Sequence, residues 1–341
     1  MHETLYRKYR PKKFDEVIGQ ESIVSSLKSA LKGGKTAHAY IFAGSKGTGK
    51  TTIARIFADA LGVSQNDLYE IDAASNRNID DIRAIRDAVA TLPFDSKFKI
   101  YLLDEVHMLT KEAWNALLKT LEEPPSHVIF IMATTELEKI PDTILSRSEL
   151  HTFKKPDQAV LKELISRTAK KEGFAIEEEA ADVLAMLSDG SFRDAHGNLQ
   201  KIISSISGAK ITLLNVEEIS GAPKMALVHN LIDAISGKDI SKAIDVVAIL
   251  RKENRDMKTF MKLLLGKARN IILLSISPQL EGELKKELTS EHLAFLKAHA
   301  GKKDGINSDT LLSLLDAYEK VSYSSFPDVA FEAALLKMLE K

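Results

Sequence analysis

A glycine-rich segment near residue 50 has the residue types and spacing needed to bind the phosphates of a nucleotide. It fits the pattern G-x-x-x-x-G-K-[ST] and reads Gly44-Ser45-Lys46-Gly47-Thr48-Gly49-Lys50-Thr51. Its glycines let the backbone N–H groups turn toward phosphate oxygens, and a helix after the loop adds its positive end. In this pattern the lysine reaches the β- and γ-phosphates, and the last hydroxyl binds Mg²⁺. We therefore predict that Lys50 and Thr51 bind ATP and Mg²⁺, with nucleotide contacts along the loop as far as Thr52.

Two carboxylates follow an apolar run farther along the chain. Ile100-Tyr101-Leu102-Leu103 leads directly into Asp104 and Glu105. At a strand's end, Asp104 could orient a Mg²⁺-bound water, and Glu105 could be the general base that polarises the attacking water. Taken alone, such a pair is an ordinary solvated strand end. Together with a phosphate-binding loop it indicates phosphoryl transfer, because that chemistry needs both parts.

Three further side chains are candidates for the same chemistry. Thr135 ends another apolar run, where its hydroxyl could bond the water or the γ-phosphate, although threonine is also common in strands. Ser191 and Asp194 resemble a capping box, which puts Arg193 in the first turn of a helix. A cation is mildly unfavourable there, which suggests an anionic partner. For Arg193 and for Arg147, the alternative is a surface ion pair.

The other polar and aromatic residues indicate no second site. The nine histidines form no pattern such as H-E-x-x-H, and the chain has no cysteine, so we expect no zinc. His107 and Trp114 are interpreted as packing or surface residues rather than catalytic ones. The aromatic and basic segment 6–11 could bind nucleic acid, but we interpret it as an ordered arm.

These side chains must be positioned by an α/β core with a parallel sheet. Helical spacing of apolar residues predicts a helix at 51–61, directly after the phosphate loop, and another at 111–121 that ends before Pro124 and Pro125. Short apolar runs with β-branched or aromatic residues predict five strands, at 39–43, 68–72, 99–103, 128–133 and 150–153.

Strand signals disappear from Lys154 onward, and the rest of the chain is predicted to be helical. Three helices are expected at 159–172, 177–188 and 193–205, and Gly221 and Pro223 mark the next boundary. Later helices include 242–252, 258–276 and 310–322. We expect three parts, namely a nucleotide-binding core at 1–153, a small three-helix lid at 154–221 and an all-α domain at 222–341.

The composition narrows the class of protein. Of 341 residues, 44% are hydrophobic and 28% charged, which is typical of a folded soluble protein. A net charge of −1 argues against a polycation that coats nucleic acid by charge alone, although it is compatible with a local basic stripe. The absence of cysteine favours a reducing cytoplasm. Without a long apolar run or a secretion signal at the start, we expect no membrane association.

Taken together, these residues resemble the AAA+ ATPases of the clamp-loader branch, and closely the gamma/tau subunits of bacterial DNA polymerase III. The resemblance covers residues 1–220, and beyond them it rests mostly on length and helical character. Besides the phosphate loop, or Walker A motif, it is carried by Tyr9-Arg10-Pro11 through Phe14, Val17-Ile18-Gly19-Gln20-Glu21, Ile71-Asp72-Ala73-Ala74-Ser75, the Walker B string Asp104-Glu105-Val106-His107-Met108-Leu109, residues 115–125, Ala133-Thr134-Thr135, Ile144-Leu145-Ser146-Arg147 and Gly190-Ser191-Phe192-Arg193-Asp194-Ala195.

The resemblance implies a role for each candidate by its position. Thr135 matches the first sensor, and Arg193 matches the second sensor, which contacts phosphate from the lid. Arg147 matches the arginine finger, which acts in trans on ATP held by the neighbouring subunit. Val17 and Ile18 match the wall beside the adenine.

The resemblance also implies an assembly at the bacterial replisome. In this family, subunits of delta and delta-prime type and further gamma/tau copies form a pentameric spiral, with the C-terminal domain as a collar. ATP binding would open a ring-shaped sliding clamp, and primer-template DNA would trigger hydrolysis and release. The alternatives are a nucleotide-binding scaffold subunit, which typically lacks the Walker lysine or acid, and another AAA+ DNA-processing ATPase.

The chain departs from the family in three ways, and its DNA contacts are weakly indicated. The four-cysteine zinc module is absent, because residues 61–68 cross directly to the next strand. Arg147 is followed by Ser148 where the family has cysteine, and the 341-residue sequence stops before the tail that the longer family form adds. Arg77 and Arg83 could touch DNA phosphates, although Asp80 and Asp81 weaken the local field.

Overall fold

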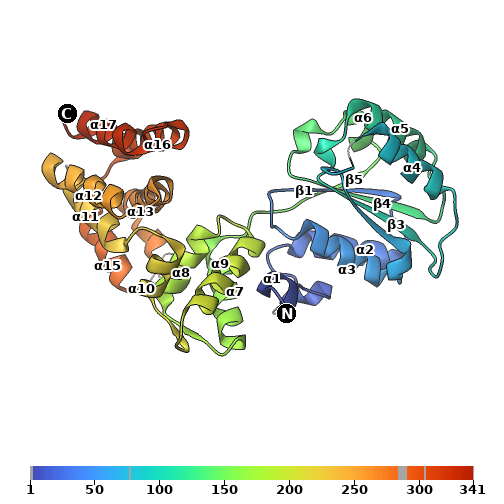
Figure 1. Ribbon diagram of the computed structural model, residues 1–341, viewed down its shortest axis with the longest axis horizontal. Helices are drawn as coiled ribbons and strands as arrows, with labels where there is room; N and C mark the ends of the chain where they lie inside the picture. Colours follow the sequence, from blue (N-terminus) through green and yellow to red (C-terminus); the bar gives the residue numbers. More distant parts are fainter. Residues whose placement is uncertain (1–2, 77, 283–289, 303–304, 341) are drawn as a thin grey trace. The chain divides into compact units, whose positions relative to one another are not determined.

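The computed structural model describes residues 3–76, 78–282, 290–302 and 305–340. The chain divides into two compact units (Figure 1), one made of Met1–Leu161 and Gly190–Gly197 and the other of Lys162–Asp189 and Asn198–Lys341. The finer division into a lid at 154–221 and a domain at 222–341 stays a prediction, because most of both ranges lies in the second unit.

The first unit is built on a five-stranded parallel sheet in the order β2-β3-β4-β1-β5. The central strands β1, β3 and β4 are buried, whereas the edge strands β2 and β5 are partly exposed. The predicted parallel sheet is confirmed, and each strand begins and ends within one residue of its expected bounds. The strands are β1 (Ala39–Ala43), β2 (Leu68–Asp72), β3 (Lys99–Asp104), β4 (Val128–Thr134) and β5 (Glu149–Thr152).

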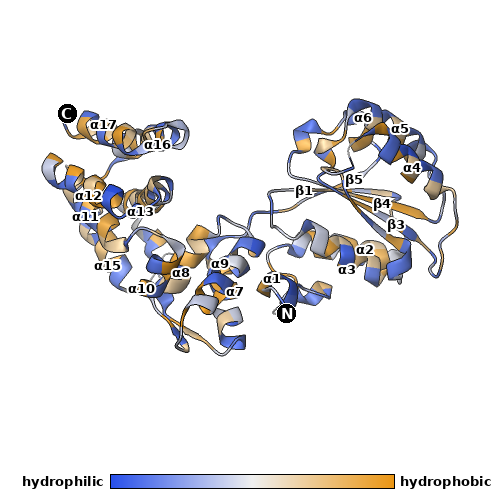
Figure 2. Ribbon diagram, viewed as in Figure 1, coloured by the Kyte–Doolittle hydropathy of each residue, from blue (hydrophilic) through white to orange (hydrophobic). Residues whose placement is uncertain are grey.

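Helices cover both faces of this sheet (Figure 1). Because successive strand residues point to opposite faces, Tyr40 and Phe42 pack with α2 (Glu21–Gly33) and α3 (Lys50–Ala60), while Ile41 packs on the other side. That side is covered by α4 (Ile79–Val89), α5 (Lys111–Glu122) and α6 (Asp142–Leu145). Figure 2 shows the apolar strands β3 and β4 and the mixed character of the helices.

The carboxyl ends of the central strands meet at one edge of the sheet. Ala43 at the end of β1 pairs with Thr134 at the end of β4, and Leu103 near the end of β3 pairs with Met132. Parallel strands bring their carboxyl ends together, and ligands bind outside such an edge. The short elements of this unit are α1 (Leu5–Lys8), η1 (Phe14–Glu16), η2 (Gln65–Asp67), η3 (Val106–Met108) and η4 (Leu137–Lys139).

A buried carboxylate fixes the crossing from α3 to β2. Asp67 is fully buried and accepts hydrogen bonds from the backbone N–H groups of Asp95 and Ser96, both at 2.8 Å, and from that of Phe94. Burial alone would raise the pKa of Asp67, but these hydrogen bonds outweigh it and lower the pKa to about 2. One aspartate therefore joins the start of β2 to the loop before β3.

The second unit is helical. The six helices that were predicted here begin and end within two residues of their expected bounds, and α7 and α9 begin in residues that belong to the first unit. Helices α10, α11, α15 and α17 were given no bounds, and α10 is a fourth helix in the range 154–221, where three were expected. The helices are α7 (Gln158–Lys171), α8 (Glu178–Leu187), α9 (Phe192–Ser205), α10 (Leu213–Ser220), α11 (Met225–Ser236), α12 (Ile240–Lys252), α13 (Met257–Ile276), η5 (Pro278–Leu280), α15 (Ser290–His299), α16 (Ser308–Tyr323) and α17 (Pro327–Leu339).

One detail of the second unit corrects the expectation of no strand after Lys154. Residues Ala175–Ile176 (β6) and Lys210–Ile211 (β7) form a short parallel pair. Two residues are too few to produce an alternating pattern in the sequence, so propensity gives no signal there.

Ionisable side chains are enclosed inside the second unit. Lys162 pairs with Asp182 at 2.8 Å, and Asp182 is only 5% exposed. Burial lowers the pKa of Lys267 to about 8 and is the main cause that lowers the pKa of His229 and of His292 to about 4. Among the described residues, no helix is both long enough and apolar enough to span a bilayer.

Candidate functional site

The phosphate loop joins β1 to α3, which is the context that its motif requires. Gly44, Gly47 and Gly49 all have positive φ, at 152°, 78° and 104°. Gly47 allows no other residue, because a Cβ there would lie 1.9 Å from Ser191 Oγ. The loop is anchored to the sheet where Gly44 N–H donates to the Thr134 carbonyl at 3.1 Å.

Lys50 is the first residue of α3, and its ammonium lies within the loop. Its Nζ donates to the carbonyls of Gly44 at 2.7 Å and Ser45 at 3.0 Å. Burial lowers the pKa of Lys50, while the charges of Glu105 and Asp104 oppose that change. The cation is therefore held over the loop backbone, where the motif binds phosphate.

Thr51 and Asp104 come from different elements and meet at the sheet edge. Thr51 Oγ1 donates to Asp104 Oδ2 at 2.9 Å, and Asp104 Oδ1 accepts from Glu105 N–H at 3.0 Å. A hydroxyl and a carboxylate are hard oxygen donors of the kind that bind Mg²⁺. These two predicted metal ligands are thus in contact and fit a Mg²⁺ ion in their chemistry.

Glu105 lies directly after β3, with its backbone in the left-handed region at φ 53°. Its Oε2 accepts a hydrogen bond from Thr135 Oγ1 at 3.3 Å, which brings the predicted base and the predicted first sensor together. His107 Nδ1 lies 3.5 Å from the same oxygen. We interpreted His107 as a packing or surface residue, and its position beside Glu105 was missed because the sequence does not show how the turn after β3 directs the ring.

Arg193 lies at the start of α9, beside the phosphate loop. Phe192 N–H donates to the Gly47 carbonyl at 3.0 Å, and Asp194 N–H donates to Ser191 Oγ at 3.1 Å, as a cap at Ser191 predicts. The Arg193 guanidinium is 5.9 Å from the centre of the Tyr6 ring. Its charge also contributes to the lowered pKa of Lys50.

Two further predicted nucleotide residues, Thr48 and Thr52, are held by hydrogen bonds. Thr48 Oγ1 donates to the Ser45 carbonyl at 2.9 Å, and Thr52 Oγ1 accepts from Arg10 Nε at 3.0 Å. Arg10 belongs to the ordered segment 6–11, as we expected. Ser45 and Lys46 are exposed, and Val17 and Ile18 are half-buried.

The Arg147 side chain is hydrogen-bonded to residues outside its own phosphate loop. Its guanidinium donates to the Thr143 carbonyl at 2.8 Å and to Glu122 Oε1 at 2.9 Å, and the side chain is exposed. Arg83 pairs with Asp80 at 3.2 Å on an exposed face, and Arg77 lies outside the described residues.

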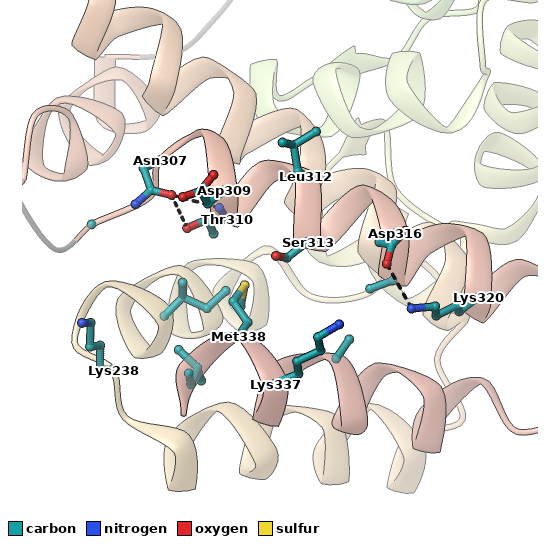
Figure 3. Close-up of a pocket in the computed structure, with 15 residues that line it drawn as sticks. Lys238, Asn307, Asp309, Thr310, Leu312, Ser313, Asp316, Lys320, Lys337 and Met338 are labelled. Atoms are coloured by element: carbon teal, nitrogen blue, oxygen red, sulfur yellow. Dashed lines mark hydrogen bonds and ion pairs between the residues drawn. The ribbon is translucent and has the colours of Figure 1, made fainter. Parts of the chain in front are cut away.

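A pocket of about 480 Å³ lies in the second unit, between α16, α17 and the turn after α11 (Figure 3). On its wall Asp316 pairs with Lys320 at 3.0 Å, and Asn307 Oδ1 accepts from Thr310 N–H at 2.9 Å. These polar groups stabilise α16, and we assign the pocket no part in the nucleotide chemistry.

Comparison with known proteins identifies relatives along the whole chain. A family model described as DNA polymerase III, delta subunit, matches residues 19–70 and 62–157. DNA polymerase III subunit tau of Bacillus subtilis is 34% identical over 99% of this chain and 63% of its own length. DNA polymerase III subunit gamma of Buchnera aphidicola is 36% identical over 81% of this chain and 80% of its own length. The chain therefore spans less than two thirds of the tau relative.

Solved structures support the fold independently. RuvB of Thermotoga maritima, a Holliday junction branch migration motor, superposes with a TM-score of 0.55 over 93% of this chain and 99% of its own. At 21% identity, this likeness concerns the fold alone. The sequence identity to the tau and gamma subunits extends through both units, and this chain belongs to the gamma/tau family of bacterial DNA polymerase III subunits.

Proposed function

We propose that this chain is an ATP-hydrolysing motor subunit of the DNA polymerase III clamp loader, associated with the replisome in the bacterial cytoplasm. The observation that carries the proposal is the meeting of four side chains at one sheet edge. Thr51 is bonded to Asp104 at 2.9 Å, and Thr135 is bonded to the adjacent Glu105 at 3.3 Å. The gamma and tau relatives carry names that agree with this role.

Each side chain has a distinct task in the proposed reaction. The loop N–H groups and Lys50 bind the β- and γ-phosphates of ATP. Thr51 and Asp104 hold Mg²⁺, which neutralises the charge that develops on the phosphates. Glu105 accepts the proton of the attacking water, and Thr135 orients its carboxylate. Arg193, whose helix begins beside Gly47, contacts phosphate as the second sensor.

We propose that Arg147 completes the site of a neighbouring subunit. Its exposed guanidinium and its bonds to Thr143 and Glu122 support a role outside its own loop. The partners in this proposal are subunits of delta and delta-prime type, further gamma/tau copies, the sliding clamp and primer-template DNA. We also propose that Arg83 and Arg77 contact DNA phosphates. The charge of Arg83 is partly balanced by Asp80, which pairs with it.

The test is ATP hydrolysis in a complex reconstituted with partner subunits, with and without sliding clamp and primed DNA. We expect clamp and primed DNA together to stimulate hydrolysis. Arg147→Ala should lower the rate of the complex by about 10³-fold, the usual contribution of an arginine finger, while the isolated chain binds ATP as before.

Two results would overturn these proposals separately. A complex that assembles but shows no stimulation by clamp and DNA contradicts the clamp-loader function. An Arg147→Ala chain that loses ATP affinity on its own contradicts the action in trans, because the arginine would then serve its own loop.

A further inference from the structure

His107 lies between two carboxylates at the edge of the sheet. It belongs to η3, and its side chain is only 8% exposed. Its Nδ1 is 3.1 Å from Thr134 Oγ1 and 3.5 Å from Glu105 Oε2, and its Nε2 is 3.3 Å from Glu136 Oε1. The ring therefore contacts the proposed general base on one side and the segment after β4 on the other.

The hydrogen bonds of Thr134 indicate which way the ring donates. Thr134 Oγ1 donates its single proton to the Glu136 carbonyl at 3.1 Å and accepts from Glu136 N–H at 3.0 Å. With that proton committed, Oγ1 can only accept from the imidazole. We therefore assign the Nδ1 proton to His107, so that Nδ1–H donates to Thr134 Oγ1 while Glu105 Oε2 lies 3.5 Å from the same nitrogen.

Glu105 Oε2 is thus contacted from two strand ends. Thr135, after β4, donates to it at 3.3 Å, and His107, after β3, faces it at 3.5 Å. On its other side His107 meets Glu136, which is itself held by Lys139 at 2.8 Å. A carboxylate supported in this way has less rotational freedom than one held by a single threonine.

From this geometry, and resting on the proposed hydrolytic function, we propose that His107 is a positioning residue for Glu105. Its Nδ1–H places the positive end of an N–H dipole beside the carboxylate oxygen that Thr135 bonds, and its Nε2 lies 3.3 Å from Glu136 Oε1. His107 itself does not touch the nucleotide in this role. It sets the place from which Glu105 meets the attacking water, where a displacement of about 1 Å costs on the order of 10²-fold in rate.

Two amide substitutions test the roles of the two ring nitrogens separately. In His107→Asn the side-chain amide can occupy the position of Nδ1, and in His107→Gln it can occupy that of Nε2. We expect His107→Asn to retain hydrolysis within about threefold, and His107→Gln and His107→Leu to lose about 10- to 100-fold. ATP affinity should stay within about twofold in all three, because none of them contacts phosphate.

The measurements are single-turnover hydrolysis in the reconstituted complex, ATP affinity of the isolated chain, and thermal unfolding. A structural role alone would lower the unfolding midpoint of all three variants and affect Asn and Gln alike. Equal hydrolysis by the Asn and Gln variants, or wild-type hydrolysis by His107→Leu, would overturn the proposal.

Glu105→Gln distinguishes this inference from the proposed function. If Glu105→Gln fails to hydrolyse ATP while His107→Leu behaves as wild type, only the positioning role is wrong. If Glu105→Gln hydrolyses ATP at the wild-type rate, the proposed base is wrong, and the role of His107 is contradicted with it.

Discussion

The two units of the chain hold their ionisable side chains in different surroundings. In the first, Asp104 and Glu105 gather at the open edge of a parallel sheet, beside Lys50. In the second, Asp182 and Lys267 are enclosed by helices and are 5% and 8% exposed. Both groups of charges are close to their partners, but only the first lies where strand ends meet.

The difference shows that a shifted pKa does not by itself mark a site of chemistry. Burial raises the pKa of Asp182 and lowers that of Lys267 to about 8, and both residues lie on helices, α8 and α13. The charge of Asp182 is balanced by Lys162, which pairs with it at 2.8 Å. Topology therefore separates functional from structural charges better than perturbation does.

The largest expected effect on ATP affinity comes from replacing one lysine in each unit. We expect Lys50→Ala to weaken ATP binding by about 100-fold or more, because it removes the cation that reaches the β- and γ-phosphates. Lys267→Met removes a buried lysine of the second unit and should leave ATP affinity within about twofold while changing stability. Calorimetric titration with MgATP and thermal unfolding of both variants check this. An equal loss of affinity in both would contradict the comparison.

Asp67 is the exception within the first unit, since it is a buried structural carboxylate. Asp67→Ala leaves the N–H groups of Phe94, Asp95 and Ser96 without their acceptor. We expect the free energy of unfolding to fall by about 2 to 4 kcal/mol, with ATP affinity unchanged in the folded protein. The control is Asp95→Ala, an exposed aspartate, which should cost less than about 1 kcal/mol. Urea unfolding measures both, and similar losses in the two variants would contradict the special role of Asp67.

The smallest effect is a difference in acid sensitivity between the surroundings of His229 and His292 in the second unit and those of Asp67 in the first. His229 and His292 have a pKa near 4 when folded, below the ordinary 6.5, so the unfolded state binds more protons as the pH falls from about 6.5 to 4. Their contribution to stability is lost in that window. The pKa of Asp67 is about 2 against an ordinary 3.8, so its contribution is lost only below about pH 4.

Acidification should therefore loosen the packing between α11 and α15 before the crossing that Asp67 holds, by roughly 1 to 3 kcal/mol between pH 6.5 and 4. Hydrogen exchange of peptides from α11 and α15, compared with those from β2, measures this. His229→Phe should make the loss smaller, because one of the two proton-binding groups is removed. Faster hydrogen exchange in β2 than in α11 at pH 5 would show that the two pH ranges are wrongly assigned.

Much of the fold could be predicted because the elements of this chain agree with their local sequence. The strands 39–43 and 68–72 were predicted to the residue, since each is a short segment with aliphatic and aromatic residues bounded by turn signals. The β6–β7 pair could not be predicted, because two residues carry no periodicity. Where the two units divide was also not visible, since residues 190–197 join the first unit through contacts such as that of Phe192 with Gly47.

The candidate site was predictable where it depends on a motif. Lys50, Thr51 and Asp104 follow from spacing and from the ends of parallel strands. The contact of Thr135 with Glu105 depends on the register of two strands. The contact of His107 with Glu105 depends on a tight turn after β3. No pattern in the sequence predicts either contact. The proposed target of Arg147 lies on a second chain, so it stays a prediction.

The backbone of Glu105 has a consequence for how this protein can evolve. A residue with a side chain at φ 53° costs of order 1 kcal/mol compared with glycine. Glycine at position 105 would therefore relieve the backbone and remove the carboxylate in a single step. Selection for thermal stability alone would favour that replacement, and selection for ATP turnover would reject it. Position 105 is thus a point where an engineered, more stable variant is expected to lose activity, and a stability screen of this chain needs a second, functional criterion.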